Sequence, residues 1–363
     1  MEKIQQRQSS GGAVRVAALL SLMVLFACKP EAPVGPEDKK IYTPVSTLRG
    51  EAPFPVGTAV QSGRIDQSSY ANLINKEFSS ITAEYEMKQD VIHMGPGSYE
   101  WGSSDAIVDF GVKNSIRVHG HALLWHSSAP AWFDTYSGDN AAFEQMMKTY
   151  IQTVVTRYKG KVASWDVVNE AFEDGSGAYR NTIYYQKMGP DYIAKCFQWA
   201  HEADPDALLF YNDYGAEYDN SKRKAIVEMI EDLKARGIPI HGFGFQMHIN
   251  YNWPSLSELT KALDALKATG LKIHFSELDV RMNPANDLTS FTEARALAQE
   301  ERYREIVTLY KTLPAEQQFG ITLWGIKDNE SWLLNFWGNP EWPLLFDSDF
   351  RYKIAHRGMV EGL

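Results

Sequence analysis

Two glutamates end short apolar runs that lie far apart in the chain. Glu170 ends the run ASWDVVNE, and Glu277 ends KIHFSE. Two carboxyl groups that face each other across a cleft are the minimum machinery for hydrolysis of a glycosidic bond. One of them must be held protonated near neutral pH while the other stays ionised. A lone glutamate at a strand end is ordinarily a solvated surface residue, whereas a pair that the fold brings together predicts a glycosidase.

Polar residues around both glutamates fit that chemistry. Asn169 adjoins Glu170 and is placed to donate to a sugar hydroxyl, a hydrogen bond that strengthens in the transition state. His248 and Asp279 are placed to hydrogen-bond around Glu277, which would fix its rotamer and keep it ionised. We therefore expect these three residues to support catalysis.

Two tryptophans offer flat apolar faces for sugar rings. Trp324 lies at the end of the last apolar run and Trp332 lies in the loop after it. Trp165 differs because it falls in the middle of an apolar run, and we expect it in the core.

The elements that must position these residues alternate between strand-like and helix-like patterns, as in a parallel sheet built from βα units. The clearest helical segments are 141–158 and 222–236. Gly237 follows the second segment and is a typical signal for the end of a helix. The apolar runs lie near 54–60, 78–85, 116–125, 162–169, 207–212, 240–248, 272–278 and 319–325. Eight such runs predict a single (β/α)8 TIM barrel. A doubly wound sheet is disfavoured because it has fewer strands and a glycine-rich first turn, which the sequence lacks.

Chemistry in such barrels occurs at the carboxyl ends of the strands. Polar and aromatic residues follow nearly every run at that end: Glu84, Lys88, His121, Trp125, His126, Asn169, Glu170, Asn212, Asp213, Tyr214, Gln246, His248, Glu277, Asp279 and Trp324. Chance would scatter them over both ends, so their gathering predicts an active site at one rim.

The first residues have the pattern of an export signal. Lys3, Arg7 and Arg15 precede the apolar run VAALLSLMVLFA, which is too short to span a bilayer and ends at Cys28. The sequence LFAC resembles a bacterial lipobox. We expect residues 1–28 to be a lipoprotein-type signal peptide, with Cys28 acylated and the protein anchored to the cell envelope at the outer membrane. Residues 29–51 are rich in proline and charge, a composition that predicts a flexible tether. We expect residues 52–363 to form the catalytic domain.

Composition limits the partners. The formal net charge is −10, which disfavours nucleic acid and suits a neutral substrate. Of two cysteines only Cys196 remains if Cys28 carries lipid, so no disulfide framework is possible and a buried thiol is expected. We expect a monomer that needs no cofactor and no metal.

Several long segments resemble glycoside hydrolase family 10, and they occur in that family's order over about 54–356. They are GHALLWHSSAPAWF (120–133), WDVVNEAFEDG (165–175), LFYNDYGAE (209–217), HGFGFQMHI (241–249), FSELDVRM (275–282) and ITLWGIKDNESW (321–332). The resemblance implies a retaining endo-β-1,4-xylanase on a TIM barrel, with Glu170 as acid/base and Glu277 as nucleophile. It also implies substrate-binding roles for Glu84, Lys88, His121, Trp125, Asn169, Gln246, His248, Trp324 and Trp332. To these we add two further candidate substrate contacts, the rim residue Asn212 and the substituted position Tyr85.

The chain departs from the family pattern beside the expected substrate cleft. The family usually reads Glu-Asn-Glu-Met-Lys where this chain reads EYEMK at 84–88, so Tyr85 replaces an asparagine that helps to bind the second sugar on the non-reducing side. Ser128 stands where the family has glutamine. These changes leave decorated xylan or another β-glycan as an alternative substrate.

Two other functions are weighed against this one. His119 and His121 alternate along one strand and, with His126 and Asp213, suggest a metal-dependent barrel hydrolase. The family resemblance explains His121 without a metal. A non-catalytic glycan-binding lipoprotein is the second alternative, but loss of catalysis would be expected to remove the catalytic glutamates first, and both are present.

Overall fold

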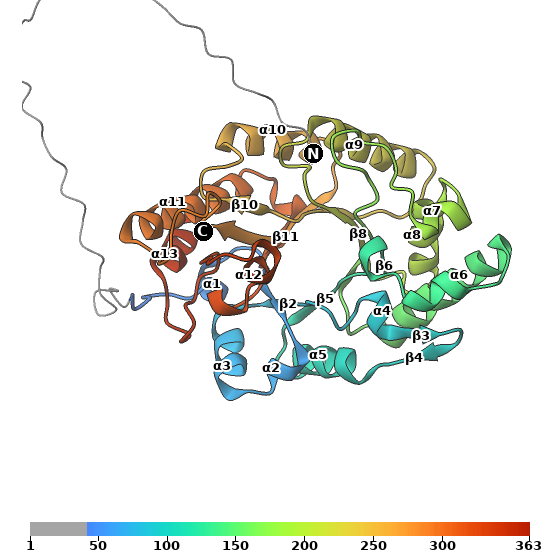
Figure 1. The fold of residues 1–363 in the computed structure, drawn as a ribbon, viewed down its shortest axis with the longest axis horizontal. Helices are drawn as coiled ribbons and strands as arrows, with labels where there is room; N and C mark the ends of the chain where they lie inside the picture. The colour runs from blue at the N-terminus through green and yellow to red at the C-terminus, as the bar shows by residue number, and fades with distance from the viewer. Residues whose placement is uncertain (1–41) are drawn as a thin grey trace, which may run out of the picture. The chain divides into compact units, whose positions relative to one another are not determined.

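The computed structural model describes residues 42–363 (Figure 1). The predicted signal peptide, its lipidation site Cys28 and most of the predicted tether lie outside the described residues. Among residues 42–363, no helix is both long and apolar enough to cross a membrane.

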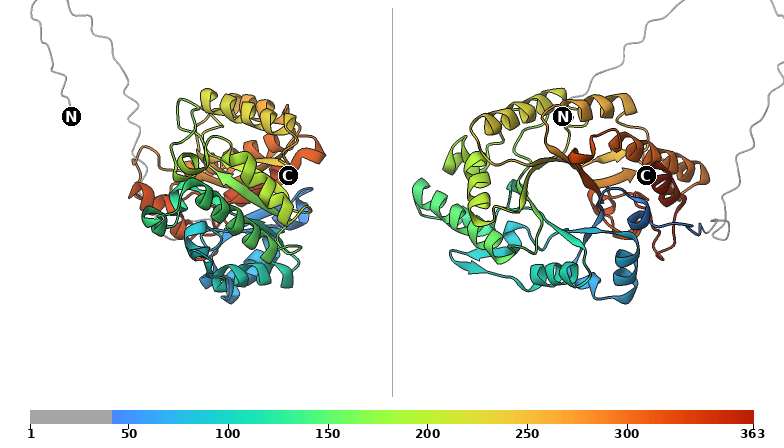
Figure 2. Two further views of the ribbon diagram at one scale, coloured as in Figure 1. Left: turned by 90° about the vertical axis from the view of Figure 1, so that its right-hand side faces the viewer. Right: turned by 180° about the vertical axis from the view of Figure 1, so that it is seen from behind.

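Eight parallel strands close into a barrel. Each strand pairs with the next and the last pairs with the first, which removes every edge of the central sheet. The strands are β1 (Val56–Val60), β2 (Ser80–Ala83), β5 (Arg117–Gly120), β7 (Ser164–Asn169), β8 (Leu208–Asp213), β9 (Gly242–Phe245), β11 (Lys272–Arg281) and β12 (Gln318–Leu323). Figure 2 shows this ring with the helices outside it. The single TIM barrel predicted from the sequence is confirmed, with a strand in each of the eight apolar runs.

The strands read as continuous apolar runs because they are covered on both faces. Every residue of β1, β2, β7 and β9 is buried, as expected for parallel strands packed between a filled interior and a helical layer. Trp165 in the middle of β7 is fully buried and lies against Gly120. A β-carbon on residue 120 would lie 2.2 Å from the Trp165 ring, so a side chain there would collide with it. Its predicted core position is confirmed.

Two predicted strands are interrupted near the rim. The run 116–125 forms β5 and then, after a break, β6 (Leu124–Trp125), which pairs with β7. The run 240–248 breaks at Met247, whose φ is 61°, and continues as β10 (His248–Asn250) beside β11. After each break the chain pairs again with a neighbouring barrel strand, β6 with β7 and β10 with β11.

Helices follow the strands around the outside. The segment predicted at 141–158 is α6 (Asn140–Arg157), capped by the Asp139 side chain, and that predicted at 222–236 is α9 (Asn220–Ala235). Gly237 after α9 has a φ of 70°, the left-handed conformation that favours glycine. The others are α2 (Ser62–Ile65), α3 (Ser68–Glu77), α4 (Gln89–Ile92), α5 (Gly102–Lys113), α7 (Ile183–Met188), α8 (Tyr192–Ala203), α10 (Leu256–Lys267), α11 (Glu293–Tyr310), α12 (Trp332–Trp337) and α13 (Ile354–Gly362). A hairpin of β3 (His93–Gly95) and β4 (Ser98–Tyr99) and 3-10 turns η1 (His126–Ser128), η2 (Ala131–Thr135), η3 (Ala315–Gln317) and η4 (Asp328–Glu330) complete the fold.

The folded domain begins earlier than residue 52. A short helix, α1 (Leu48–Glu51), lies within the predicted tether. Leu48 is fully buried, and its amide donates to the buried Glu77 carboxylate at 3.0 Å. The tether was extended too far because the single apolar side chain of Leu48 gives no periodic pattern, although it packs in the core.

Cys196 lies in α8 with no exposed surface. Burial raises the pKa of its thiol well above the ordinary value. The expected buried, unpaired thiol is confirmed.

Candidate active site

Glu170 is the first residue after β7 and its backbone is left-handed, with a φ of 57°. That conformation is unfavourable for a glutamate, and the backbone hydrogen bond from its amide to the Asn212 carbonyl at 2.9 Å helps to hold it. Its Oε1 atom accepts hydrogen bonds from Gln246 at 3.0 Å and Asn169 at 3.3 Å. Within residues 42–363, no side chain donates to Oε2, so this oxygen is left to meet a ligand.

Glu277 lies in β11 and is 5% exposed. Both carboxylate oxygens have partners, because Asn212 donates to Oε1 at 2.7 Å and His248 lies 3.3 Å from Oε2. Burial alone would raise the pKa of this carboxyl. The hydrogen bond with His248 and the positive charges of His121, His248 and Lys88 outweigh burial and hold the pKa below its ordinary value. Glu277 is therefore kept ionised at neutral pH.

Three amides bridge the two glutamates. Asn212 donates to Glu277 and also to Asn169 Oδ1 at 2.9 Å, and Gln246 lies 3.3 Å from the same oxygen while donating to Glu170. The two strands that carry the glutamates, β7 and β11, are separated on this side by β8 and β9, and these intervening strands supply Asn212 and the Gln246 that follows β9. Asn212 and Gln246, predicted to bind substrate, thus contact the glutamates directly.

The orientation of the Asn212 amide is fixed from behind. Ser276 donates to Asn212 Oδ1 at 2.6 Å, which leaves the amide nitrogen to point at Glu277. A β-carbon on Gly244 of β9 would lie 2.0 Å from the same oxygen. Ser276 and Gly244 escaped the sequence analysis because neither a serine nor a glycine inside a strand signals contact with a catalytic group.

His248 and Asp279 surround Glu277 as predicted. His248 Nδ1 lies 3.0 Å from Asp279 Oδ2, and the indole of Trp332 donates to the same oxygen at 2.9 Å. Burial would lower the pKa of the imidazole, but Asp279 and Glu277 together raise it to about 10. The charged imidazolium therefore sits between two carboxylates, and Trp332 packs edge-on against it at 4.9 Å between ring centroids.

His121 and His119 of the β5 segment share one carboxylate partner that the sequence analysis missed. Both rings contact Asp166 Oδ2, His121 at 2.8 Å and His119 at 3.0 Å. Burial would raise the pKa of Asp166, but the two histidines hold it below the ordinary range. Asp166 lies inside the apolar strand β7, and an acidic residue within such a run is the signal that could have identified it.

The HxH pair thus has a carboxylate partner, and the other two residues of the suggested metal site have different neighbours. Asp213 forms an ion pair with Lys222 at 2.7 Å, and His126 packs against Trp125 at 6.1 Å between centroids. In the part of the chain that the structure describes, no group of three or more histidine, cysteine or acidic residues is placed to hold a metal ion.

The predicted substrate-binding residues after β2 and β6 form one flank of the mouth. Lys88 Nζ lies 4.9 Å from the Tyr85 ring centroid and 4.6 Å from that of Trp125, so the ammonium sits between the two rings. Gln61 donates to Glu84 at 2.8 Å. Burial lowers the pKa of Lys88, and the negative charges of Glu277 and Glu84 oppose that shift. We call Glu84, Tyr85, Lys88 and Trp125 the first flank.

Tyr85 belongs to this flank and its ring is 46% exposed. Ser128, the second departure from the family pattern, is 2% exposed and donates to the Trp125 carbonyl at 3.4 Å. Trp324 completes the floor, with its ring 5.3 Å from His121 and 6.4 Å from His248 between centroids. The structure thus brings all predicted site residues within 42–363 to one rim.

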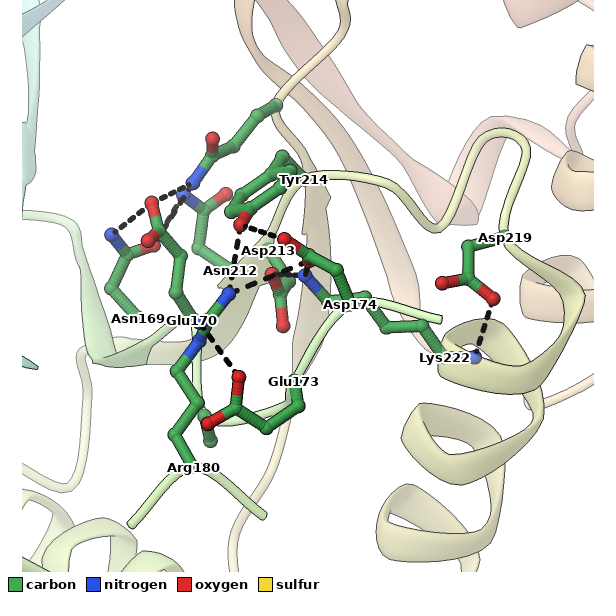
Figure 3. A network of polar contacts seen from close by, with 12 residues as sticks. Asn169, Glu170, Glu173, Asp174, Arg180, Asn212, Asp213, Tyr214, Asp219 and Lys222 are labelled. Atoms are coloured by element: carbon green, nitrogen blue, oxygen red, sulfur yellow. Dashed lines mark hydrogen bonds and ion pairs between the residues drawn. The ribbon is translucent and has the colours of Figure 1, made fainter. Parts of the chain in front are cut away.

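A polar network beyond Glu170 was not predicted (Figure 3). Lys222 of α9 and Asp213 form an ion pair in which neither side chain is exposed, and Lys222 also reaches Asp174 at 3.0 Å. Burial raises the pKa of Asp213, the nearby Glu170 carboxylate adds to the rise, and the value reaches about 7 despite Lys222. Tyr214 donates to Asp174 at 2.7 Å and accepts from Arg180 at 2.8 Å. A lysine on an amphipathic helix gave no sequence signal of burial.

Comparison with known proteins assigns this arrangement to a family. The model of glycosyl hydrolase family 10 matches residues 47–362. Endo-beta-1,4-xylanase Xyn10C of Cellvibrio japonicus is 39% identical over 88% of this chain, which spans 58% of that relative's length. Endo-1,4-beta-xylanase B of Paenibacillus barcinonensis is also 39% identical, with 83% of this chain and 92% of the relative covered.

Solved structures of xylanases resemble this chain in fold as well as in sequence. Xylanase 10C from Cellvibrio japonicus, solved as a mutant in complex with xylopentaose, superposes with a TM-score of 0.84 at 37% identity, covering 88% of this chain and 69% of that one. Xylanase 10B from Thermotoga maritima gives a TM-score of 0.80 at 35% identity, covering 85% of this chain and 94% of that one.

Replacing Asp279 with asparagine tests the charge state of His248. The pKa of the imidazole should fall by more than one unit from about 10, toward the unperturbed value of about 6.5. The reason is that the variant removes the charge of Asp279, which raises this pKa more than Glu277 does. An NMR titration of the histidine side chains measures this shift. His241, whose pKa burial lowers, serves as control and should titrate unchanged. An imidazole of His248 that keeps a pKa of about 10 would contradict the assignment.

Proposed function

The chain belongs to glycosyl hydrolase family 10, and on that premise we propose that it is a retaining endo-β-1,4-xylanase. It cuts internal β-1,4 bonds of xylan by double displacement. The observation that carries the proposal is the amide bridge between Glu170 and Glu277, because it holds two carboxyls at one site in different surroundings. A pair of that kind is what two-step glycoside hydrolysis requires.

The first step uses each carboxyl once. Glu277 attacks the anomeric carbon of the bound sugar and forms a covalent glycosyl ester, while the bond to the leaving oxygen breaks. Glu170 gives its proton to that oxygen, and the shortened chain departs. In the second step Glu170 takes a proton from water, the water oxygen attacks the anomeric carbon, and Glu277 leaves as a free carboxylate. Configuration is retained after the two inversions.

The surroundings support this division of roles. Glu277 has both oxygens paired and its pKa lowered by His248, His121 and Lys88, which suits a group that must be ionised to attack. Glu170 has Oε2 free of side-chain donors within residues 42–363, which suits an oxygen that passes a proton to and from ligand.

The substrate follows from the family and from the form of the mouth. The relatives named above are xylanases, and one binds xylopentaose in its crystal structure. In this chain, Trp324 and Trp332 lie around His121, His248 and Glu277. Flat apolar faces beside hydrogen-bonding groups suit a neutral pyranose whose hydroxyls lie at the ring edge.

Variants of the two glutamates separate their roles. Glu277→Ala should abolish turnover of every glycoside, because no ester can form. Glu170→Ala should reduce hydrolysis of xylan by several orders of magnitude while forming the ester almost normally from an activated aryl xylobioside, whose leaving group needs no proton. Burst kinetics on both substrates measure the difference. Gln317→Ala, far from the mouth, is the matched control for general loss of stability. Equal losses by both glutamate variants on both substrates would show that the roles are wrongly assigned.

A preference for decorated xylan is proposed from Tyr85. Its phenol occupies more space than an asparagine and presents one hydroxyl instead of a donor and an acceptor. The Lys88 ammonium lies over the ring and the hydroxyl interacts with Glu84, so the side chain is held within the first flank. We infer that it remodels the binding of the second sugar on the non-reducing side, and that Ser128 leaves space beside it.

Tyr85→Asn should raise kcat/KM on linear xylo-oligosaccharides several-fold, since binding energy at that sugar orients the scissile bond. The rates on arabinose-substituted xylan should rise less. Initial-rate measurements on both substrates decide the matter, with Tyr85→Phe as the matched control that keeps the ring. If kcat/KM of the Tyr85→Asn variant on the linear substrate is unchanged or lower, Tyr85 does not contact the bound chain and the proposal is wrong.

We also propose that the enzyme is exported and anchored by lipid on Cys28. The support is the sequence of residues 1–28 alone, a charged start and a short apolar run that ends in LFAC. Mass spectrometry of the protein from bacterial envelopes should find an acylated Cys28 at the mature N-terminus. Cys28→Ser should release the enzyme from the membrane fraction with its activity unchanged. An unmodified cysteine, or an unchanged membrane fraction, would refute the anchor.

A further inference from the structure

A carboxylate near Trp332 ties the loop after β12 to the helices after β1. Glu330 belongs to η4, two residues before Trp332, and its side chain is 16% exposed. Arg64 of α2 lies 3.2 Å from Glu330 Oε2. Tyr70 of α3 donates its hydroxyl to Glu330 Oε1, and Lys327 Nζ lies 2.8 Å from the same oxygen. Three partners from two regions of the chain therefore hold one partly buried carboxylate.

The position of Glu330 is transmitted to the Trp332 ring. Ser331 separates the two residues and caps α12, because its hydroxyl accepts a hydrogen bond from the helix backbone at 3.3 Å. The Trp332 indole donates to Asp279 at 2.9 Å, which places the ring beside the hydrogen-bond partners of Glu277. With a single capping residue between them, a shift of Glu330 also shifts the Trp332 ring.

The helix that carries Arg64 is joined to the first flank as well. Gln61, which precedes α2, donates to Glu84 at 2.8 Å. The first amide of α2 donates to the carboxylate of Glu86, which lies two residues after Glu84. Arg64 is the third residue of this four-residue helix. The short α2 therefore contacts the first flank at its start and Glu330 near its end.

Little space remains between these parts. The gap between α2, α3 and the loop after β12 measures about 20 Å³, and its polar lining is made by Gln61, Arg64, Tyr70, Glu84 and Glu330. A gap of this size holds about one water molecule. Packing therefore keeps the first flank and the Trp332 loop from moving closer together, and the contacts of Glu330 keep them from moving apart.

In the proposed function the two parts meet neighbouring sugars of one chain. The sugar that Glu277 attacks lies against Trp332, and the next sugar on the non-reducing side lies at the first flank. A pyranose ring is rigid, so the distance between the two contact surfaces must match the distance between neighbouring rings. An error of about 1 Å weakens one contact or moves the anomeric carbon away from Glu277, and either change slows the reaction.

We propose that Glu330 is a positioning residue that sets the spacing between the binding sites of the two sugars on the non-reducing side of the scissile bond. The inference rests on the proposed function and deepens it. Glu330 acts through Trp332 on one side and through α2 on the other. Without its negative charge, Arg64 and Lys327 lose their shared partner and repel each other, so α2 and the Trp332 loop move apart.

The test compares Glu330→Gln with the parent enzyme on 4-nitrophenyl xylobioside and on 4-nitrophenyl xyloside. The xylobioside occupies both sugar positions, whereas the xyloside occupies only the one at Trp332. The ratio of kcat/KM for the xylobioside to kcat/KM for the xyloside should fall about three- to tenfold, the range of a coupled ion pair. A residue that only stabilises the fold would lower both values equally and leave the ratio unchanged.

Arg64→Met removes the same contact from the other side. It should lower the ratio by a similar factor, and the double variant with Glu330→Gln should fall no further than the more affected single variant, because the two changes break one interaction. The indole N–H resonance of Trp332, assigned by its loss in Trp332→Phe, should move in both single variants.

Glu144→Gln is the matched control, because Glu144 of α6 forms a partly exposed ion pair with Lys195 of α8 at 2.7 Å, outside the barrel mouth. It should leave the ratio and the Trp332 resonance as in the parent. An unchanged ratio in Glu330→Gln, or additive losses in the double variant, would overturn the positioning role while leaving the xylanase assignment intact. A parent enzyme that hydrolyses neither compound would instead refute the proposed function, and this inference with it.

Discussion

The chain of amides between Glu170 and Glu277 is the contact on which the rest of the site depends. A buried carboxylate is unfavourable unless hydrogen bonds and nearby charges replace the water it loses. Asn212 supplies one of those bonds to Glu277, and the register of β8 against β7 and β9 sets where Asn212 lies. The barrel wall thus serves chemistry as well as stability, because the pairing of β7, β8, β9 and β11 sets where these side chains meet.

The same geometry gives the two carboxyls different neighbours. Glu277 faces the imidazolium of His248 and the ammonium of Lys88, whereas Glu170 accepts hydrogen bonds from the neutral amides of Asn169 and Gln246. His248 in turn owes its charge to Asp279, whose oxygen also accepts from Trp332. The tryptophan expected to stack on sugar therefore also orients the group that keeps Glu277 ionised. Binding and catalysis share one hydrogen-bond system.

Much of this arrangement could be predicted because parallel strands bring their carboxyl ends to one rim. Glu170, Asn169, Glu277 and Trp324 each follow an apolar run, so the fold class alone gathers them. The contacts that link them could not be predicted in the same way. Asn212 and Gln246 were expected to meet substrate, and the structure shows that they also hold the glutamates, which depends on side-chain directions across neighbouring strands.

The sequence by itself determined the eight-stranded barrel, the family and the gathering of Glu170 and Glu277 at one rim, since these follow from periodicity and from motifs that are local along the chain. Only the tertiary structure decided that α1 belongs to the domain and that Tyr218 and Trp253 are in contact. It also decided that Asp166 is the buried partner of His121 and that Lys222 is the buried partner of Asp213. Each of these is a contact between residues from different elements or loops. A single buried leucine, a charged residue inside an element or a lone aromatic in a loop has no periodic pattern, and its meaning arises only from the neighbour that folding places beside it.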